Sequence, residues 1–240
     1  MSVPSSSAST TRQRLAAGET LVGAFLNLGS PVAAEVCARS GFDWLLVDLE
    51  HGAGTEAELV PSLQAIDEHC AALVRVEANE RPRFARALDS GADGVMVPRI
   101  DSAADAAAAV SHMRYAPRGV RGMASMNRAK GWGFGEESVD PLCIIQVETR
   151  GAVEEARQIA ATEGVDVLFV GPTDLGAVLG TTDLPLEDVI AAAHEGGKVA
   201  GILARSREDA DRYIAQGFRF VGIGSDSLFL AQGARAAAGA

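Results

Sequence analysis

Short apolar runs alternate with amphipathic, helix-like segments along almost the whole chain, and this alternation restricts the possible folds more than any other feature. The apolar runs are rich in Val, Ile and Leu and span residues 21–28, 43–50, 71–78, 94–100, 142–148, 165–171, 199–204 and 218–224. The amphipathic stretches between them are 31–39, 55–69, 81–89, 102–114, 151–162, 186–195 and 206–216. Strands that alternate with helices favour parallel pairing. Eight such units in 240 residues predict a single (β/α)8 TIM barrel.

Composition and charge narrow the class of protein further. Hydrophobic residues make up 48% of the chain but aromatic residues only 5%, so Ala, Val, Leu and Ile must provide most of the packing. This favours an α/β protein over an aromatic-rich β-sandwich. The net charge is −11 and no basic stripe is visible, which argues against nucleic acid as a partner. An acidic protein also repels anionic substrates at long range, so a site for a carboxylate needs a local cation or arginine.

The two ends of the chain differ in character from the central part. We expect residues 1–17 to be disordered or extended, residues 18–232 to form the barrel, and residues 233–240 to be a flexible tail. The first ten residues lack the pattern of a signal peptide, and no apolar run approaches the ~20 residues needed to cross a bilayer. We therefore expect a cytoplasmic protein without a membrane partner, whose three cysteines are reduced thiols.

Two further patterns concern the connections. Gly-X-Asp precedes an apolar run at Gly41–Asp43, Gly91–Asp93 and Gly164–Asp166, and glycine there suits a left-handed helix cap. Residues 115–141 form a long Gly-rich connection without periodicity, which is typical of a lid, a partner contact or a plain solvent loop.

Polar side chains gather where the predicted strands end, and barrel enzymes carry their sites at that end. Alternation along a strand points Asp48 and Glu50 into the barrel and Leu45 and Val47 toward the helices, and His51 follows directly. The same alternation points four further side chains into the barrel, those of Arg75, Glu77, Gln146 and Glu148. Asp174 follows the sixth strand at the start of a helix. Burying such groups is costly unless they are paired or bind a ligand, so their convergence predicts a functional site.

The residue types suggest metal-assisted chemistry on a 2-oxo acid. Two carboxylates, Glu148 and Asp174, suit a hard cation such as Mg²⁺ or Mn²⁺ that keeps positions open for substrate. Paired His or Cys ligands for a structural zinc ion are absent from the sequence. His51, oriented by Asp48 or Glu50, can move a proton, and Arg75 can stabilise a carboxylate or oxyanion. Amide groups around Thr173 at a helix start can hold the substrate carboxylate.

Several segments, in this order and spacing, resemble the HpcH/HpaI aldolase family of class II pyruvate aldolases. They are residues 21–52, GADGVMVPRIDS, RYAPRGVRG, CIIQVET and VLFVGPTDLG, and the resemblance covers residues 18–232. It implies a barrel enzyme that reversibly cleaves a 4-hydroxy-2-oxo acid to pyruvate, or a close 2-oxo acid, and an aldehyde through a metal-stabilised enolate. The implied cofactor is Mg²⁺ or Mn²⁺, with Co²⁺ or Zn²⁺ as alternatives.

The resemblance also implies roles for individual residues. Glu148 and Asp174 match the metal ligands, His51 the catalytic base with Asp48 as its partner, and Arg75 the arginine at the pyruvate oxygens. The positions that line the pyruvate site are matched by Gln146, Gly171, Pro172 and Thr173. Small molecules are the implied partners, together with a homo-oligomer, a hexamer or trimer, in which the C-terminal helix is exchanged.

Other functions remain open at this point. The stretch GAGT after His51 departs from the family pattern on the aldehyde side, so the acceptor is undetermined. Malyl- and citryl-type ester lyases of the same superfamily, and a non-catalytic barrel that binds 2-oxo acids, are alternatives. A Schiff-base aldolase needs an inward lysine, and Lys130 and Lys198 are poorly placed for that role. A phosphate-binding isomerase would use GIGSD at 222–226.

Overall fold

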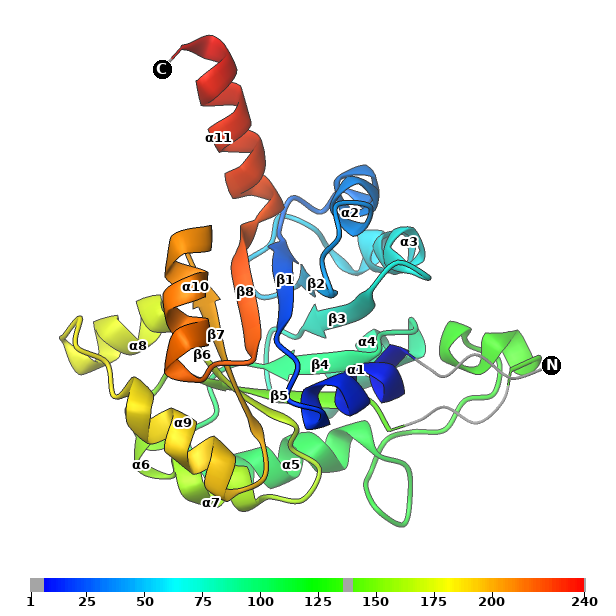
Figure 1. Cartoon of the computed structure of the whole chain (residues 1–240). Helices are drawn as coiled ribbons and strands as arrows, with labels where there is room; N and C mark the ends of the chain where they lie inside the picture. Colours follow the sequence, from blue (N-terminus) through cyan, green and yellow to red (C-terminus); the bar gives the residue numbers. More distant parts are fainter. Residues whose placement is uncertain (1–6, 136–139, 240) are drawn as a thin grey trace.

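Eight parallel strands close into a barrel in chain order in the computed structural model, which describes residues 7–135 and 140–239 (Figure 1). The strands are β1 (Leu21–Leu26), β2 (Trp44–Asp48), β3 (Ala71–Arg75), β4 (Gly94–Val97), β5 (Leu142–Val147), β6 (Val167–Val170), β7 (Val199–Ala204) and β8 (Phe220–Ser225). Each strand pairs with the next, and β8 pairs with β1 through a register shift between Gly23 and Phe25. The predicted TIM barrel is confirmed.

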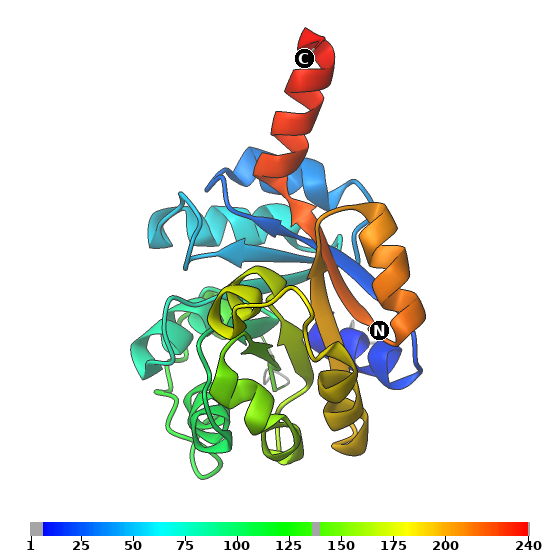
Figure 2. The same ribbon diagram turned by 90° about the vertical axis from the view of Figure 1, so that its left-hand side faces the viewer.

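Helices cover the outside of the barrel in the connections between strands (Figures 1 and 2). They are α2 (Pro31–Ala38), α3 (Glu56–Ile66), α4 (Arg81–Asp89), α5 (Ala103–Met113), α6 (Arg150–Glu154), α7 (Ala156–Ala161), α8 (Pro172–Leu179), α9 (Leu186–Glu195) and α10 (Arg207–Gln216). The connection between β6 and β7 contains two helices, and α8, the first of them, begins directly after the strand end. This extra helix brings a helix N-terminus to the mouth of the barrel.

The inside of the barrel is packed around aromatic rings. Trp44 stacks on Phe220 at 4.4 Å between ring centroids and meets Phe25 and Phe169 edge-on. Glycine provides the space for this cluster, because a Cβ atom at Gly23 would lie 2.0 Å from Trp44 Cδ2. Four of the twelve aromatic residues of the chain thus lie inside the barrel, where large side chains are needed to fill it. Leu45 and Val47 pack in the separate outer core beneath the helices, as the strand alternation predicts.

The Gly-X-Asp repeat has a structural explanation at the amino ends of the strands. Asp43, Asp93 and Asp166 each accept the backbone N–H of a neighbouring strand, from Val22, Ala72 and Cys143 respectively, at 2.8 Å. The glycine two residues earlier has a positive φ in every case, as a left-handed turn requires. Each repeat thus ends a helix and supports the start of a strand pair.

A helix, α1 (Ser7–Ala16), closes the amino end of the barrel, so the expectation of a disordered or extended segment over 1–17 is wrong for Ser7–Ala16. Residues 1–6 lie outside the described part of the chain. Leu15 joins the inner core, and Arg12 and Arg14 form ion pairs with Asp166 and Asp43 at 2.8 Å. The helix is weakly amphipathic in sequence, and these long-range contacts hold it in place.

The C-terminal segment also differs from expectation. The helix α11 (Asp226–Ala238) runs through most of the residues expected to be a flexible tail, and residue 240 lies outside the described residues. Figures 1 and 2 show α11 projecting from the barrel, with only its first turn near the other elements. Asp226 is buried at its start and accepts the N–H groups of Asn27 and Leu28.

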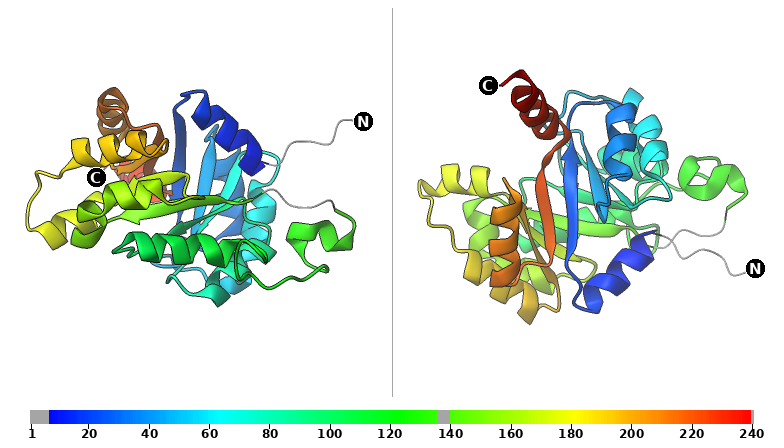
Figure 3. Two further views of the ribbon diagram at one scale, coloured as in Figure 1. Left: turned by 90° about the horizontal axis from the view of Figure 1, so that it is seen from below. Right: turned by 45° about the horizontal axis from the view of Figure 1, so that its top comes forward.

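The long connection 115–141 leaves α5 and enters β5, which places it at the amino end of the barrel beside α1 (Figures 1 and 3). It contains a 3-10 helix, Arg128–Gly133, and residues 136–139 are outside the described part. Of the three roles considered for it, a lid over the carboxyl-end site of the same barrel is wrong, because the segment lies at the opposite end. A partner contact and a solvent loop both remain compatible with its exposed Met123, Met126 and Phe134.

Two smaller findings concern the membrane and the thiols. No helix within residues 7–135 and 140–239 is long and apolar enough to span a bilayer. The three cysteines are free thiols, and burial raises the pKa of Cys70 to about 12.

Candidate active site

A buried arginine–aspartate pair lies at the carboxyl ends of β2 and β3. Asp48 and Arg75 are register partners, and Arg75 donates from Nε to Oδ1 at 2.9 Å and from Nη2 to Oδ2 at 2.7 Å. Burial alone would lower the pKa of Arg75, but the hydrogen bonds and charge of Asp48 raise it above its ordinary value. A bidentate pair of this kind fixes the orientation of the guanidinium. Arg75 is therefore a charged group with a defined direction at the mouth of the barrel.

The same aspartate supports the turn that carries His51. Asp48 Oδ1 accepts the backbone N–H groups of Glu50 at 3.1 Å and His51 at 3.2 Å. The carboxylate nearest the imidazole is that of Glu50, whose Oε1 lies 3.8 Å from His51 Nε2. The His51 side chain is 65% exposed. Of the two carboxylates expected to orient His51, Glu50 approaches the ring and Asp48 holds the backbone.

Glu50 connects the arginine and the histidine. Its Oε2 lies 3.1 Å from Arg75 Nη1, an ion pair in which that oxygen accepts no well-directed hydrogen bond from the described residues. Burial raises the pKa of Glu50, while the charge of Arg75 lowers it. The inward direction of Glu50 agrees with strand alternation, but the sequence did not indicate its position between two functional groups.

Glu148 follows β5 and is almost fully buried, with 4% of its surface exposed. Its Oε2 accepts Gln146 Nε2 at 2.9 Å, and its Oε1 accepts the backbone N–H of Arg99 at 2.8 Å. Burial raises the pKa of Glu148, and the negative charges of Glu50 and Asp174 raise it further. Gln146 Oε1 is buried and accepts no hydrogen bond within the described residues. Burying a carboxylate next to an unpartnered amide oxygen costs free energy of desolvation, and a bound cation or hydrated ligand would offset that cost.

The start of α8 forms the other wall of the site. Pro172 occupies the first helical position, where a missing N–H has no cost, and Asp174 lies exposed in the first turn. No side chain caps this helix start, so its free N–H groups, including the one at Thr173, are available to an anion. A Cβ atom at Gly171 would lie 3.2 Å from Glu148 Oε2, so the glycine lets the backbone approach the buried carboxylate.

These residues fit a hard divalent cation. Within the described residues, no group of three or more His, Cys, Asp or Glu side chains is arranged as a complete protein cage. Glu148 and Asp174 are close enough to influence one another electrostatically, and Mg²⁺ commonly takes one or two carboxylates with water or substrate in the other positions. The donor set consists of oxygens only, which suits Mg²⁺ or Mn²⁺ better than a soft metal.

Other sequence-predicted groups lie outside the site. Glu77 forms an ion pair with Arg83 at 3.3 Å instead of joining the inward cluster. Lys198 precedes β7 at the amino end, and Lys130 lies over the Tyr115 ring on the long connection. The sequence reasoning missed Arg99, which has a φ of 54° and holds Glu148 through its backbone N–H. A backbone donor has no side-chain signature, so only the fold reveals it.

Comparison with known proteins identifies the relatives of this chain. The family model for the HpcH/HpaI aldolase/citrate lyase family matches residues 21–232. The chain belongs to this family. It is 38% identical over 232 residues to a hydroxypyruvate/pyruvate aldolase of Chromohalobacter salexigens, covering 90% of this chain and 91% of the relative. It is 37% identical over 226 residues to a 5-keto-4-deoxy-D-glucarate aldolase of Klebsiella pneumoniae, covering 88% of each.

The solved structures agree with the sequence comparisons. An HpcH/HpaI aldolase/citrate lyase family protein from Burkholderia cenocepacia superposes with a TM-score of 0.90 at 37% identity, covering 95% of this chain and 97% of that one. Because the family and the relatives agree over nearly the whole length, this HpcH/HpaI family member is an enzyme of the aldolase, or lyase, type.

Proposed function

We propose that this family member is a divalent-metal-dependent aldolase that reversibly cleaves a 4-hydroxy-2-oxo acid to pyruvate, or a close 2-oxo acid, and an aldehyde. The observation that carries the proposal is the buried carboxylate of Glu148, which lies beside an unused amide oxygen and within the electrostatic reach of Asp174. The names of the relatives, which include a hydroxypyruvate/pyruvate aldolase, support the same chemistry.

Glu148 and Asp174 would hold the cation, and the unpartnered Gln146 Oε1 would be free to accept a hydrogen bond from a hydrated ligand. When bound there, the cation would supply Lewis acidity toward the keto oxygen of the substrate. The free N–H groups at Thr173 and Asp174 bind the substrate carboxylate at the positive end of α8. These contacts orient the bond between C3 and C4 of the substrate toward His51 and Arg75.

His51 acts as the base in the cleavage direction. Its imidazole takes the proton of the C4 hydroxyl, the O–H electrons form the aldehyde carbonyl, and the electrons of the C3–C4 bond pass to the 2-oxo acid as an enolate. The same proton then returns to C3, so that pyruvate is released with a methyl group. Arg75 Nη1 stabilises negative charge on the reacting oxygens. Asp48 keeps both Arg75 and the His51 turn in position through the four hydrogen bonds described above.

The test is retro-aldol turnover of 4-hydroxy-2-oxo acids by the purified protein, followed as pyruvate release with lactate dehydrogenase. Chelation should abolish turnover, and Mg²⁺ or Mn²⁺ should restore it. Glu148→Gln should lose metal binding and lower kcat/KM by about 1,000-fold, in line with the loss of an electrostatic contact in the transition state. Glu77→Gln, which removes a carboxylate outside the site, is the matched control. Turnover that survives exhaustive chelation would refute the proposal.

We also propose that the chain forms a homo-oligomer, a hexamer or trimer, with α11 exchanged between copies. The projecting helix carries Leu230, which is 63% exposed, and neighbouring α2 exposes Val32 at 72%. Burial of both faces against a second copy would remove apolar surface from water. Light scattering should give a trimeric or hexameric mass, and Leu230→Asp should reduce it. A monomeric mass for the unaltered chain at micromolar concentration would overturn this assignment.

A further inference from the structure

The proposed substrate has two halves, and the groups described so far bind only one of them. The 2-oxo acid lies against Glu148, Asp174 and the start of α8, which follow β5 and β6. The C4 hydroxyl gives its proton to His51, which follows β2 on the other side of the closed ring of strands. The substituent on C4, which becomes the body of the aldehyde, therefore extends toward the end of β2 and the strands beside it.

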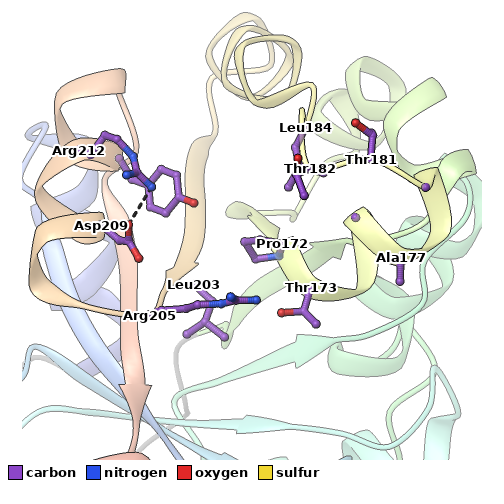
Figure 4. A pocket seen from close by; sticks show the side chains of 13 residues that line it. Pro172, Thr173, Ala177, Thr181, Thr182, Leu184, Leu203, Arg205, Asp209 and Arg212 are labelled. Atoms are coloured by element: carbon purple, nitrogen blue, oxygen red, sulfur yellow. Dashed lines mark hydrogen bonds and ion pairs between the residues drawn. The ribbon is translucent and has the colours of Figure 1, made fainter.

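A groove of about 910 Å³ between α8 and α10 does not provide room for that substituent (Figure 4). Of the site residues only Pro172 and Thr173 line it, at the end of the substrate that carries the C1 carboxylate. The strands that flank β2, and with it His51, are β1 and β3. Glu77, which follows β3, pairs with Arg83 outside the site. The end of β1 is therefore the place to look for contacts with the aldehyde half.

Asn27 directly follows β1, and the register of β1 and β2 places it level with Asp48. Phe25, two residues earlier, packs inside the barrel, and the guanidinium carbon of Arg75 lies 5.2 Å from the centre of its ring. The backbone of Asn27 keeps the direction of the strand, since its N–H is bonded on the β8 side to Asp226 at 2.9 Å. The alternation of β1 therefore carries the Asn27 side chain inward, into the layer of Asp48 and Arg75.

The backbone of Asn27 is also bonded to the loop that follows the proposed base. Its carbonyl oxygen accepts the N–H of Ala53 at 2.8 Å. Farther along the same two segments, Gly29 and Gly54 pack backbone to backbone, and a Cβ atom at Gly29 would lie 2.5 Å from Gly54 Cα. Asn27 and the loop after His51 thus form one continuous wall beside the imidazole.

The side-chain amide of Asn27 makes no hydrogen bond within residues 7–135 and 140–239. Its Oδ1 is buried without a partner, although the residue as a whole is only half-buried. A buried amide oxygen of this kind costs free energy, which a ligand that donates a hydrogen bond would recover. Rotation about the Cβ–Cγ bond exchanges the two ends of the amide, so either the oxygen or the NH2 group can face the site.

The charges on this side of the site select a neutral partner for the amide. Asp226 is buried beside Asn27, and Asp48 and Glu50 lie at the end of β2. Arg75 offsets only one of these three negative charges. A carboxylate on C4 would be repelled, and an alkyl group would leave the amide without a partner. A hydroxyl group avoids both costs, because it can donate to Oδ1 and accept from Nδ2.

We infer that Asn27 determines specificity for the aldehyde half by hydrogen bonding to a hydroxyl group on the carbon next to the aldehyde carbonyl. In the intact substrate this group is the C5 hydroxyl. The inference rests on the proposed function, since it requires the C4 hydroxyl to meet His51. Asn27 thus favours 4,5-dihydroxy-2-oxo acids over 4-hydroxy-2-oxo acids that carry an alkyl group in the same place.

The experiment compares 4,5-dihydroxy-2-oxopentanoate with 4-hydroxy-2-oxohexanoate, which differ only in a terminal hydroxyl or methyl group. Pyruvate release by the full-length protein in Mn²⁺ gives kcat/KM for each. The unaltered protein should favour the dihydroxy acid about tenfold, as expected for one hydrogen bond to a substrate hydroxyl. Asn27→Leu, which keeps the size of the side chain, should remove this preference by lowering kcat/KM for the dihydroxy acid alone. Asn27→Ala provides the same comparison if leucine does not fit.

Asn79→Leu is the matched control. Asn79 also has a buried Oδ1 without a partner among the described residues, but its Nδ2 donates at 3.0 Å to the carbonyl oxygen of Asp105 on α5, outside the barrel. This variant should keep the tenfold preference.

Three results would overturn the inference alone: equal kcat/KM for the two substrates in the unaltered protein, a preference that persists in the folded Asn27 variants, or an equal loss on both substrates in those variants. The last result would mean that Asn27 supports the site without contacting the hydroxyl. Failure of the unaltered protein to cleave either substrate in Mn²⁺ would overturn the proposed function instead. The two failures therefore give different results.

Discussion

Asp48→Asn is the substitution that most directly tests how the site is held together. Asparagine has nearly the same shape and can still accept the N–H groups of Glu50 and His51, but it removes the charge opposite Arg75. Breaking a buried ion pair by removing one partner commonly costs about 3–5 kcal/mol. Glu50, 3.1 Å from Arg75 Nη1, remains as a second counter-charge, so we expect a smaller loss, about 2–3 kcal/mol of unfolding free energy.

In Asp48→Asn, kcat/KM should fall by more than the loss of unfolding free energy would lead one to expect. With Asp48 neutral, Glu50 becomes the main partner of Arg75 and draws the guanidinium away from the reacting oxygens. Loss of one preorganised electrostatic contact lowers turnover by about 100- to 1,000-fold, and we expect kcat/KM to fall by about 100-fold. The assays are urea unfolding followed by circular dichroism and retro-aldol turnover at a temperature where the variant is fully folded.

Asp166→Asn supplies the matched control at the other end of the barrel. Asp166 also forms a two-point pair with an arginine, Arg12, and also accepts a backbone N–H, from Cys143. This pair is more exposed, so its loss should cost about 1–2 kcal/mol of stability and leave kcat/KM unchanged. Equal losses of turnover in the two folded variants, or unaltered turnover in Asp48→Asn, would refute a positioning role for Asp48.

Three other substitutions test separate parts of the structure. His51→Gln should keep metal affinity and lower kcat by about 100-fold, with exposed His69→Gln as the control, and wild-type kcat would exclude His51 as the base. Gly171→Ala places a methyl group 3.2 Å from Glu148 Oε2 and should weaken metal binding about tenfold, measured by calorimetry; unchanged affinity would show that the site relaxes freely. Gly23→Ala brings a methyl group within 2.0 Å of Trp44 and should lower unfolding free energy by about 3 kcal/mol, so a stability equal to wild type would contradict the described inner packing.

The parts of the fold that the sequence predicts are those controlled by periodicity. Alternation along β2 places Asp48 inward and Leu45 and Val47 outward, and the structure has them so. The two chain ends were harder to predict, because α1 is held by Arg12, Arg14 and Leu15 through contacts with residues far along the sequence. The composition of the Ser- and Thr-rich N-terminal segment does not indicate these contacts. Tertiary packing, and not local propensity, decides whether this segment is helical.

The site was predictable as a set of residues but not as a network. Strand alternation directs Glu50 and Glu77 inward alike, yet Glu50 lies between Arg75 and His51 while Glu77 pairs with Arg83. Both strands end two residues earlier, β2 at Asp48 and β3 at Arg75, so the period of two governs neither side chain, and the arginine that each carboxylate pairs with decides its direction. The backbone contribution of Arg99 to Glu148 was inaccessible for a different reason, since it depends on a turn with positive φ and not on a side chain.

The charge balance of the mouth explains why a cation and an anionic substrate are compatible in an acidic protein. The four carboxylates of Asp48, Glu50, Glu148 and Asp174 lie near the guanidinium of Arg75, and this group of five side chains carries three negative charges in excess when all are ionised. Burial is the main cause of the raised pKa values of Glu50 and Glu148, and the repulsion between these carboxylates raises both pKa values further. A divalent cation would remove most of the excess and would lower both pKa values, so that metal binding and the ionised form of Glu148 favour each other. The same ion would change the carboxyl end of the barrel from a region that repels a 2-oxo acid into one that binds it. The carboxylates that destabilise the folded protein by repelling one another are therefore also those that would bind the cation and, through it, the substrate.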